Sequence, residues 1–521
     1  MNPDGTLGLG PEIAGPPQSA FTFQNVETSD TLGQVDEYFF QFDVERPWAP
    51  FNITSDLKLG GRFSYRNATL EDTDLEIDAD FVAGSGIDAS YETILSNRAT
   101  EATFPQPAMT QQSEEQAFAK RDELFAAARA ESAVITQSNV WENFYDVDEN
   151  VFALYAMNTF RWDKFDIIVG ARVEYTDMSG IGNEPIDEDA IDDILEAGSS
   201  RGITLGELYA ARDADGNPIL RQVKADQDYI DFFPAVHFNY RHTEDLVARL
   251  AYTESILRPS YSQFAPNREI GEDSDLAGNG GVVFISGGNP ELEPYRSRNL
   301  DFYVERYLPY RGILSFGLFA KWIDDPIFGS TQSLDGAAFG FPGSQVRLSG
   351  PLNGSDGEIR GFEATYSQQF GFLPEPWDGF GVSLNYTYSD DSAKTPALIN
   401  PETGRNDGAS RTSGLTGASE ETYNTSVFFE KYGISTRLSY QYRSPWLNSI
   451  DIGQPLLDRY WDARPSLDLS LRYSFNENFL IYVDANNLTD ERGRRYRDND
   501  NFVYELEGFG SSYLAGIRFT L

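Results

Sequence analysis

The chain has 521 residues, no cysteine, and 82 Asp and Glu against 40 Lys and Arg, which gives a formal net charge of −42. The missing cysteines exclude a disulfide framework, a thiolate nucleophile and a Cys-type zinc site. The negative charge argues against a nucleic-acid partner, because each phosphate contact needs a cation. His237 and His242 are the only imidazoles, so a His-based metal or acid-base centre is not expected. No cofactor is predicted either.

In chain order, the first 34 residues predict only a loop, and they lack the basic and apolar regions of a signal peptide. No later segment has the roughly 18 apolar residues of a transmembrane helix. We therefore expect either a cytosolic protein or a chain that lacks its original front end. Residues 1–34 are interpreted as an N-terminal loop or the remnant of a missing upstream region.

From Val35 to Leu521 the sequence alternates between apolar and polar residues in about sixteen segments, each typical of a β-strand. In ISTRLSYQYR, residues 434–443, the even positions carry Ile434, Leu438, Tyr440 and Tyr442, and the odd positions are polar. A period of two places these two sets on opposite faces of one strand. The pattern predicts an all-β protein, although it does not say which face meets water.

The predicted connections alternate between short and long along the chain. Short ones fall near residues 47–51, 162–164, 242–244, 308–311, 373–378, 431–432 and 476–477. Long ones fall near residues 67–145, 178–227, 259–293, 326–356, 391–419, 445–463 and 491–500. Short turns at one rim and long loops at the other are typical of an antiparallel up-and-down β-barrel of the outer-membrane type.

Strand length and tryptophan placement favour the same architecture. Ten residues at about 3.3 Å each, tilted by about 40–45°, rise roughly 23–25 Å, the height of the apolar band of such barrels. All seven tryptophans lie at predicted strand ends, where indole rings prefer the membrane interface: Trp48, Trp162 and Trp377 at short turns, and Trp141, Trp322, Trp446 and Trp461 beside long loops. We therefore expect Leu438 to face lipid and Ser439 to face the lumen.

Candidate ligand-binding residues gather at one loop root, SPWLNSIDIGQPLLDRYWDARP, residues 444–465. Aromatic rings beside charged groups suit stacking on sugar faces while hydroxyls are hydrogen-bonded. The alternative is an interface belt without a ligand. Two arginines on the polar face of residues 434–443 are added as candidates that line the lumen, so the predicted substrate site comprises Trp446, Asp458, Arg459, Tyr460, Trp461, Asp462, Arg437 and Arg443.

Two acidic stretches, DADGN at 213–217 and YDVDE at 145–149, have oxygen ligands suited to calcium, but solvated loops are the preferred interpretation. No GxSxG, Walker loop, HExxH or zinc ribbon occurs. The sequence therefore predicts no catalytic residues and no enzyme.

Ordered segments across nearly the whole chain resemble the β-barrel part of TonB-dependent outer-membrane receptors. They include SILRPSYSQFAP (255–266), GNPELEPYRSRNLDFYVERYL (288–308), IRGFEATYSQQF (359–370), FFEKYGISTRLSYQYRSPWL (428–447), ANNLTDE (485–491) and YLAGIRFTL (513–521). They are most similar to the subfamily often linked to carbohydrate uptake. The resemblance assigns residues 35–521 to the C-terminal part of such a barrel.

The resemblance implies a plugged barrel of 22 strands that takes up a scarce, bulky nutrient with energy from the TonB complex. No plug domain or TonB box is recognisable at the start of this chain, and about sixteen strands are counted, so a C-terminal fragment of a longer transporter is expected. The expected partners are outer-membrane lipid and lipopolysaccharide, TonB through an absent plug, and the nutrient. A monomer in the outer membrane of a Gram-negative bacterium is expected.

A carbohydrate or oligosaccharide is the leading predicted substrate, and a ferric siderophore is the next. A passive porin would need no plug and is a different class of function. A soluble β-rich adhesin or sugar-binding protein is a third class, which would stay in the aqueous phase without detergent.

Overall fold

The computed structural model describes residues 26–77, 87, 95–99, 110–112, 119–124, 126–127, 136–138, 144–186, 190–191, 194, 205–272, 282–339, 343–398, 408–498 and 501–520. The chain divides into two compact units. Unit 1 comprises residues 1–34, 69–144 and 182–223, and unit 2 comprises residues 35–68, 145–181 and 224–521. Among the described residues, no helix is long and apolar enough to cross a bilayer.

Unit 1 holds several short elements and a small apolar cluster. A β-ladder joins β3 (Leu95–Ala99) to β4 (Thr110–Gln112), and β5 (Thr136–Ser138) pairs with the distal end of β2. Helix α4 (Leu205–Ala210) contributes Leu208 to a cluster with Ile191, Ile219 and Leu220. These four side chains are almost completely buried.

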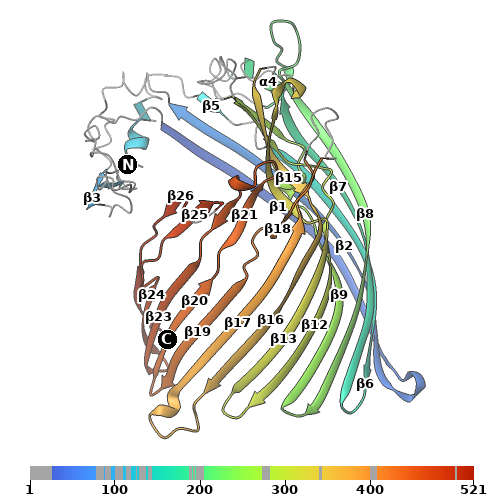
Figure 1. The fold of residues 1–521 in the computed structure, drawn as a ribbon, viewed down its shortest axis with the longest axis vertical. Coiled ribbons are helices and arrows are strands. Elements are labelled where there is room, and N and C mark those ends of the chain that lie inside the picture. The colour runs from blue at the N-terminus through green and yellow to red at the C-terminus, as the bar shows by residue number, and fades with distance from the viewer. Residues whose placement is uncertain are drawn as a thin grey trace, which may run out of the picture. The chain divides into compact units, whose positions relative to one another are not determined.

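Long antiparallel strands form the wall of unit 2 and follow one another in chain order (Figure 1). Their sheet has 17 strands among the described residues, of which two, β5 and β18 (Thr412–Ser413), are short side pairings. The remaining strands are β1 (Val26–Trp48), β2 (Thr54–Ile77), β6 (Tyr145–Arg161), β7 (Phe165–Pro185), β8 (Leu220–Thr243), β9 (Leu246–Leu257), β12 (Tyr295–Leu308), β13 (Gly312–Asp324), β16 (Ser355–Gln369), β17 (Phe380–Lys394), β19 (Glu421–Lys431), β20 (Ile434–Arg443), β23 (Arg464–Asn476), β24 (Phe479–Asn486) and β27 (Ser512–Phe519).

This wall confirms the predicted up-and-down β-barrel architecture and the predicted rhythm of connections. Tight turns join β6 to β7, β8 to β9, β12 to β13, β19 to β20 and β23 to β24, and the short 3₁₀ helices η2 (Pro50–Asn52) and η5 (Trp377–Gly379) lie in two further short connections. Long segments alternate with them. Among the described residues β1 pairs with β2 and β27 with β24, and the barrel is not closed.

One face of the wall carries apolar side chains that are exposed to the surroundings. On β20, Leu438 is 45% exposed, and its neighbours across the ladder are Val427 and Leu469. The exposed set on this face continues through Leu250, Leu300, Phe302, Leu314, Phe316, Leu318, Leu384, Val427, Leu471 and Ile481. So large an apolar surface would be unstable in water, whereas hydrocarbon solvates it.

Aromatic rings gather where the short turns lie. Trp162 stacks on Phe165 with ring centroids 4.6 Å apart, and Trp377 stacks on Phe380 at 5.7 Å. Trp48 is the last residue of β1, and Trp322, Trp446 and Trp461 lie at or near strand ends beside long loops. Trp141 lies outside the described residues. The exposed rings of Trp48, Trp322 and Trp377 match an interfacial aromatic girdle, whereas Trp446 is buried.

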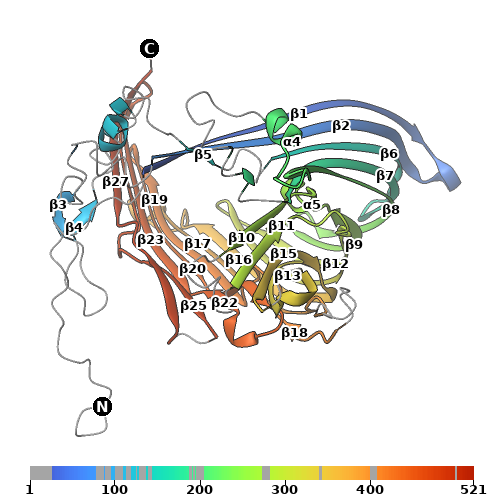
Figure 2. The same ribbon diagram turned by 90° about the horizontal axis from the view of Figure 1, so that it is seen from above.

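The described parts of the long loops of unit 2 form a second sheet at the long-loop end (Figure 2). Its eight strands follow the order β10 (Arg268–Glu272), β11 (Val282–Gly287), β15 (Gln345–Asn353), β14 (Ile327–Asp335), β21 (Trp446–Asp451), β22 (Arg459–Trp461), β25 (Gly493–Arg497) and β26 (Val503–Glu507). The pairs β11–β15 and β14–β21 are parallel. Helices α5 (Tyr261–Phe264), η4 (Gly336–Phe339) and η6 (Pro455–Leu457) lie in the same loops.

Most of the fully buried apolar side chains of unit 2 support this loop layer. The largest cluster joins Ile323, Phe328, Ala393, Leu415, Leu447, Ile450 and Ile452. Two smaller clusters surround Phe264 and Val346. The loops therefore have a packed core of their own, whereas the middle of the wall is one sheet thick.

Candidate functional site

A row of four side chains crosses the second sheet. Trp446 on β21 lies opposite Trp461 on β22, Trp461 lies opposite Arg495 on β25, and Arg495 lies opposite Glu505 on β26. The indoles stack with centroids 5.7 Å apart and an interplanar angle of 20°, and the Arg495 guanidinium lies 4.0 Å from the Trp461 centroid. Arg495 also bonds to Glu505 at 2.7 Å. Cross-strand stacking and cation–π contact hold this row together.

Arg443, at the end of β20, joins the row from the barrel wall. Its guanidinium carbon lies 3.8 Å from the centroid of Trp446. Its Nε donates to Ser419 Oγ at 2.7 Å, and a terminal nitrogen donates to the carbonyl oxygen of Gly417. The indoles thus lie between two guanidinium groups, which is a favourable arrangement for the negative face of an aromatic ring.

Tyr460 points away from this row because it alternates with Trp461 on β22. Its ring stacks on Tyr496 with centroids 5.4 Å apart, and it packs against the buried cluster that contains Leu447 and Phe328. Burial raises the pKa of the Tyr460 phenol above its ordinary value. Tyr460 and Trp461 are therefore not on the same face for a ligand to contact together.

The charged members of the predicted site are bound to protein partners. Asp458 is almost fully buried; both of its carboxylate oxygens lie 2.6 Å from Arg411 Nη2, and one accepts from the backbone N–H of Asp451 at 2.9 Å. Asp462 accepts from Arg494 Nη1 at 2.5 Å. Arg411 thereby supplies the partner that the buried charge of Asp458 needs inside the 444–465 loop.

The structure brings seven of the eight predicted residues to one rim, and Arg437 is the exception. Arg437 lies earlier on β20, on its lumen face, where it donates to Ser426 Oγ at 3.1 Å and lies 4.9 Å from the Phe428 centroid. Arg459 lies over Tyr504, 5.6 Å from the ring centroid. The assignment of these residues to a ligand stays a prediction.

Sequence reasoning did not single out Arg411, Arg464, Arg495 or Tyr496, which complete the rim. For Arg495 and Tyr496 a signal was present, since GRRYR at 493–497 places arginines and an aromatic in strand alternation. For Arg411 none was present, because its partner Asp458 is 47 residues away.

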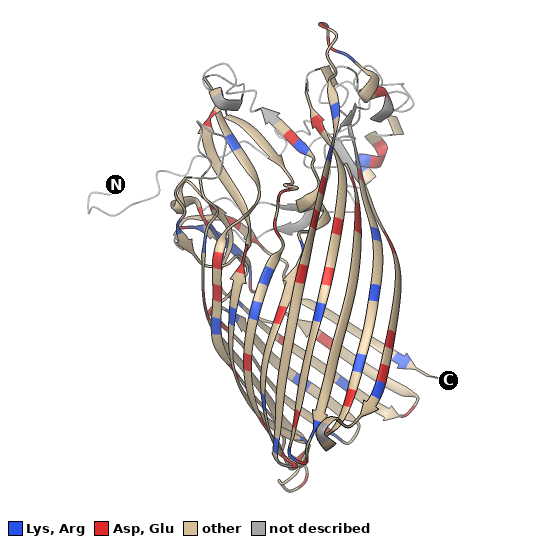
Figure 3. Cartoon of the chain, turned by 90° about the vertical axis from the view of Figure 1, so that its right-hand side faces the viewer, with Lys and Arg blue, Asp and Glu red and all other residues tan. Residues whose placement is uncertain are grey.

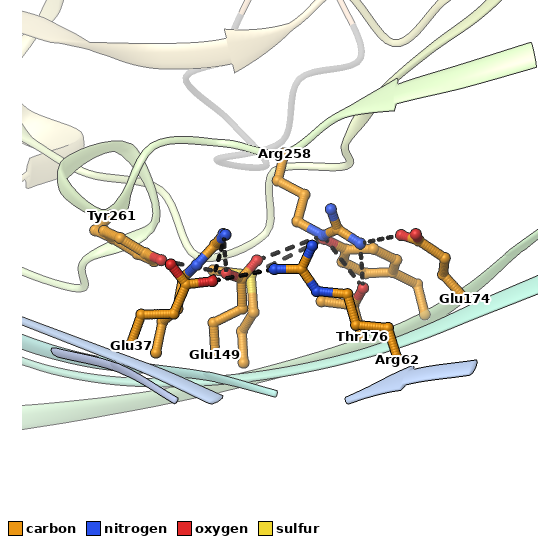
Figure 4. Close-up of polar contacts among 10 residues, drawn as sticks. Glu37, Arg62, Glu149, Glu174, Thr176, Arg258 and Tyr261 are labelled. Carbon is orange, nitrogen blue, oxygen red and sulfur yellow. Dashed lines mark hydrogen bonds and ion pairs between the residues drawn. The ribbon is translucent and has the colours of Figure 1, made fainter. Parts of the chain in front are cut away.

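A second polar cluster lies on the lumen face of the wall and is centred on Arg258, directly after β9 (Figure 4). Its Nη2 donates to Glu174 at 2.6 Å and to Thr176 Oγ1 at 2.9 Å, and its Nε lies 3.4 Å from Glu149. Glu149 also accepts from Tyr261 at 3.2 Å. Both glutamates are buried, so Arg258 neutralises charges that would otherwise be costly.

Local sequence explains how Arg258 reaches this position. Pro259 ends the strand, and the side chains of Ser260 and Gln263 form a reciprocal capping box at the start of α5. The helix then buries Phe264 beside Met178. The turn at residues 258–260 thereby holds the loop after β9 against the wall.

The cluster extends to β1 and β2, where Glu37 accepts from Arg62 at 3.2 Å and from Arg66 at 3.1 Å. Residues 145–149 begin β6, so their interpretation as a solvated loop is wrong. The other candidate calcium stretch is a turn: Asp213 accepts from the backbone N–H groups of Asp215 and Asn217. No group of three or more potential metal ligands occurs among the described residues.

Charged residues recur along the long strands (Figure 3), and cross-strand partners lie on the lumen face. Arg249 on β9 pairs with Glu305 on β12 at 2.5 Å. Tyr303 on β12 reaches across Gly317 on β13 and donates to Glu363 on β16 at 2.8 Å. A Cβ on Gly317 would lie 2.3 Å from the Tyr303 ring, so only glycine leaves space for this contact.

A wall with one lipid-compatible face, one hydrated face, an aromatic girdle and an ordered loop layer is that of an outer-membrane β-barrel receptor. The family model described as "TonB dependent receptor-like, beta-barrel" matches residues 2–488. The chain belongs to this family, whose members are transport receptors. No curated protein sequence matches the chain.

Solved structures support the fold. The ferric-catecholate import receptor Fiu from E. coli K12, in its closed form, has a TM-score of 0.54 and 14% identity, over 94% of this chain and 55% of its own. The siderophore receptor PiuA from Acinetobacter baumannii has a TM-score of 0.53 and 11% identity, over 94% of this chain and 56% of its own. The ferric citrate transporter FecA, in its unliganded form, has a TM-score of 0.51 and 12% identity, over 96% of this chain and 56% of its own. The chain thus spans about half the length of these receptors.

Proposed function

We propose that this chain forms the ligand-recognising wall and rim of a TonB-dependent transporter in the outer membrane of a Gram-negative bacterium. The transporter would capture a scarce, bulky nutrient at the loop layer and import it with energy from the TonB complex. The observation that carries the proposal is the combination of a lipid-compatible outer face with long loops that fold into a second sheet. A wall that only scaffolds would not need an ordered loop layer.

A ferric siderophore is the substrate class that we favour. The solved receptors most relevant here are described as importing ferric catecholates, siderophores or ferric citrate. The rim also concentrates arginine in a strongly acidic chain, and ferric complexes of catecholate or carboxylate ligands are anionic.

A carbohydrate is the second candidate, supported by the aromatic content of the 444–465 loop. Its physical basis is weaker in this geometry. Trp446 is contacted by Trp461 and Arg443, and Trp461 by Trp446 and Arg495. Sugar stacking needs an open indole face, and these contacts cover the indole faces.

The test is uptake of iron-55 bound to a catecholate siderophore by cells that carry or lack this gene, in backgrounds with and without TonB. We expect the gene to raise uptake only where TonB is present. Uptake that does not need TonB would indicate a passive porin instead. Gene-dependent uptake of a labelled neutral oligosaccharide, without uptake of iron, would replace the siderophore by a carbohydrate.

A further inference from the structure

A cavity of about 560 Å³ lies where β19, β20 and β23 meet residues 487–493 and 509–510. Its lining includes the side chains of three arginines, Arg443, Arg464 and Arg492, and one acidic residue, Glu491. Neutral hydrogen-bonding groups such as Asn424 and Gln441 complete it. The volume is typical of a small-molecule site, and the charge of the lining is positive in a chain whose net charge is −42.

Two of these arginines face each other without a counter-ion. Arg443 on β20 lies directly opposite Arg464 on β23. Like charges at directly opposed positions destabilise a β-ladder. Within the described parts of the chain, neither guanidinium has a carboxylate within 4.0 Å, and their contacts are with the indoles of Trp446 and Trp461 and with neutral oxygens.

Three other arginines on the lumen side are neutralised, and Arg437, whose contacts are Ser426 and Phe428, has no second cation opposite it. Arg249 pairs with Glu305, Arg258 with Glu174, and Arg472 with Asp484. Arg472 is the most direct comparison, because it lies on the same strand as Arg464 and an even number of residues away, so it shares its face. The uncompensated pair is thus a local feature and not a property of the wall.

The Arg443 guanidinium is also fixed in position. Its Nε and one terminal nitrogen are bonded to Ser419 and Gly417, and its plane lies over Trp446. The second terminal nitrogen, Nη1, has no bond to a described residue and remains available. A pre-oriented guanidinium loses little conformational freedom when it binds an oxyanion.

We propose that the Arg443–Arg464 cavity binds an anionic group of the transported ligand, such as a catecholate, carboxylate or phosphate oxygen. This inference rests on the proposed uptake function and names the chemistry of its ligand. The two guanidiniums supply charge-assisted hydrogen bonds to the oxyanion, and the ligand in turn supplies the missing counter-charge between them.

The experiment compares two ferric complexes of opposite charge on the purified protein in detergent: the anionic ferric tris(2,3-dihydroxybenzoate) and the cationic ferric desferrioxamine B. Binding is measured by isothermal titration calorimetry. We expect the wild type to prefer the anionic complex. We expect the double variant Arg443→Gln/Arg464→Gln to bind it about tenfold to several hundredfold more weakly, since charge-assisted hydrogen bonds make contributions of this size.

Arg472→Gln is the matched control, because it removes one cation from the same face of β23 but lies outside the cavity. It should bind the anionic complex with wild-type affinity. The single variant Arg464→Gln tests the site if the double variant does not fold, because Arg464 is exposed and has no hydrogen bond to a described residue. Equal affinity of the wild type for the two complexes, including no binding of either, overturns the inference, as does a double variant that binds like Arg472→Gln.

Different assays would refute the proposed anion site and the proposed uptake function. Charge-selective binding that depends on Arg443 and Arg464, combined with no TonB-dependent uptake of iron, retains the anion site and refutes the proposed uptake of a ferric siderophore. TonB-dependent iron uptake that is unchanged in the double variant retains the function and refutes the site.

Discussion

Replacing Leu438 with arginine tests the orientation of the wall. Leu438 is the fifth residue of the ten-residue strand β20, so it lies about 13 Å along the strand and about 10 Å along the membrane normal, at 3.3 Å per residue and a tilt of about 40–45°. Half of the apolar band is about 12 Å, so the side chain is near its middle. Arginine on the lipid face at that depth costs about 2–4 kcal/mol, or about 30-fold to 900-fold in the folding equilibrium.

Ser439→Arg is the matched substitution on the other face of the same strand. Its neighbours across the ladder are Ser426 and Asp468, and a new cation beside Asp468 in a hydrated lumen should change stability by no more than about 0.5 kcal/mol. Both variants are refolded into lipid vesicles and titrated with urea, and the folded fraction is read as the heat-modifiable band on unheated gels. Equal costs for Leu438→Arg and Ser439→Arg would refute the assignment of the faces.

Three further predictions concern the clusters that hold the loops. Arg258→Ala leaves Glu149 and Glu174 without this partner and should lower the free energy of unfolding by about 3–5 kcal/mol, measured as a shift of the urea midpoint. Phe328→Ala should cost about 3–5 kcal/mol in the loop layer, and it should speed hydrogen exchange there while membrane insertion is retained. Burial raises the pKa of Tyr261 to about 12, so the folded state keeps a proton that the unfolded state loses from pH 10 upward; stability should fall between pH 10 and 12, and Tyr261→Phe should flatten that slope.

The strands of the wall could be predicted because the sequence patterns that indicate them are local. A period of two along residues 434–443 fixes which side chains share a face, and turn residues at short intervals fix antiparallel pairing of neighbours. Both signals are contained in about ten residues. Strand lengths and tryptophan positions predicted which face of the wall meets lipid and which meets water. The exposed fraction of Leu438 agrees with its predicted place on the lipid face.

The loop layer could not be predicted, because it is built from contacts between distant segments. The parallel pairing of β11 with β15 joins residues about 63 positions apart, as in Val282 with Gln345. Composition suggested that Trp446, Tyr460 and Trp461 would act together, but strand alternation in β22 separates Tyr460 from Trp461. The unmatched Arg443–Arg464 pair needs the register of β20 against β23, which no local pattern contains.

The distribution of buried side chains bears on the ligand capture proposed above. Loops of most proteins are the least ordered segments and lose conformational entropy when they bind. Here the cluster around Phe328 and the stacked row from Trp446 to Arg495 order the loops before any ligand arrives. The ordering cost is therefore met during folding, so an anion that enters beside Arg443 finds the guanidinium already placed. A rim of this kind favours tight binding of a scarce ligand, because less of the interaction free energy is lost to arranging the site.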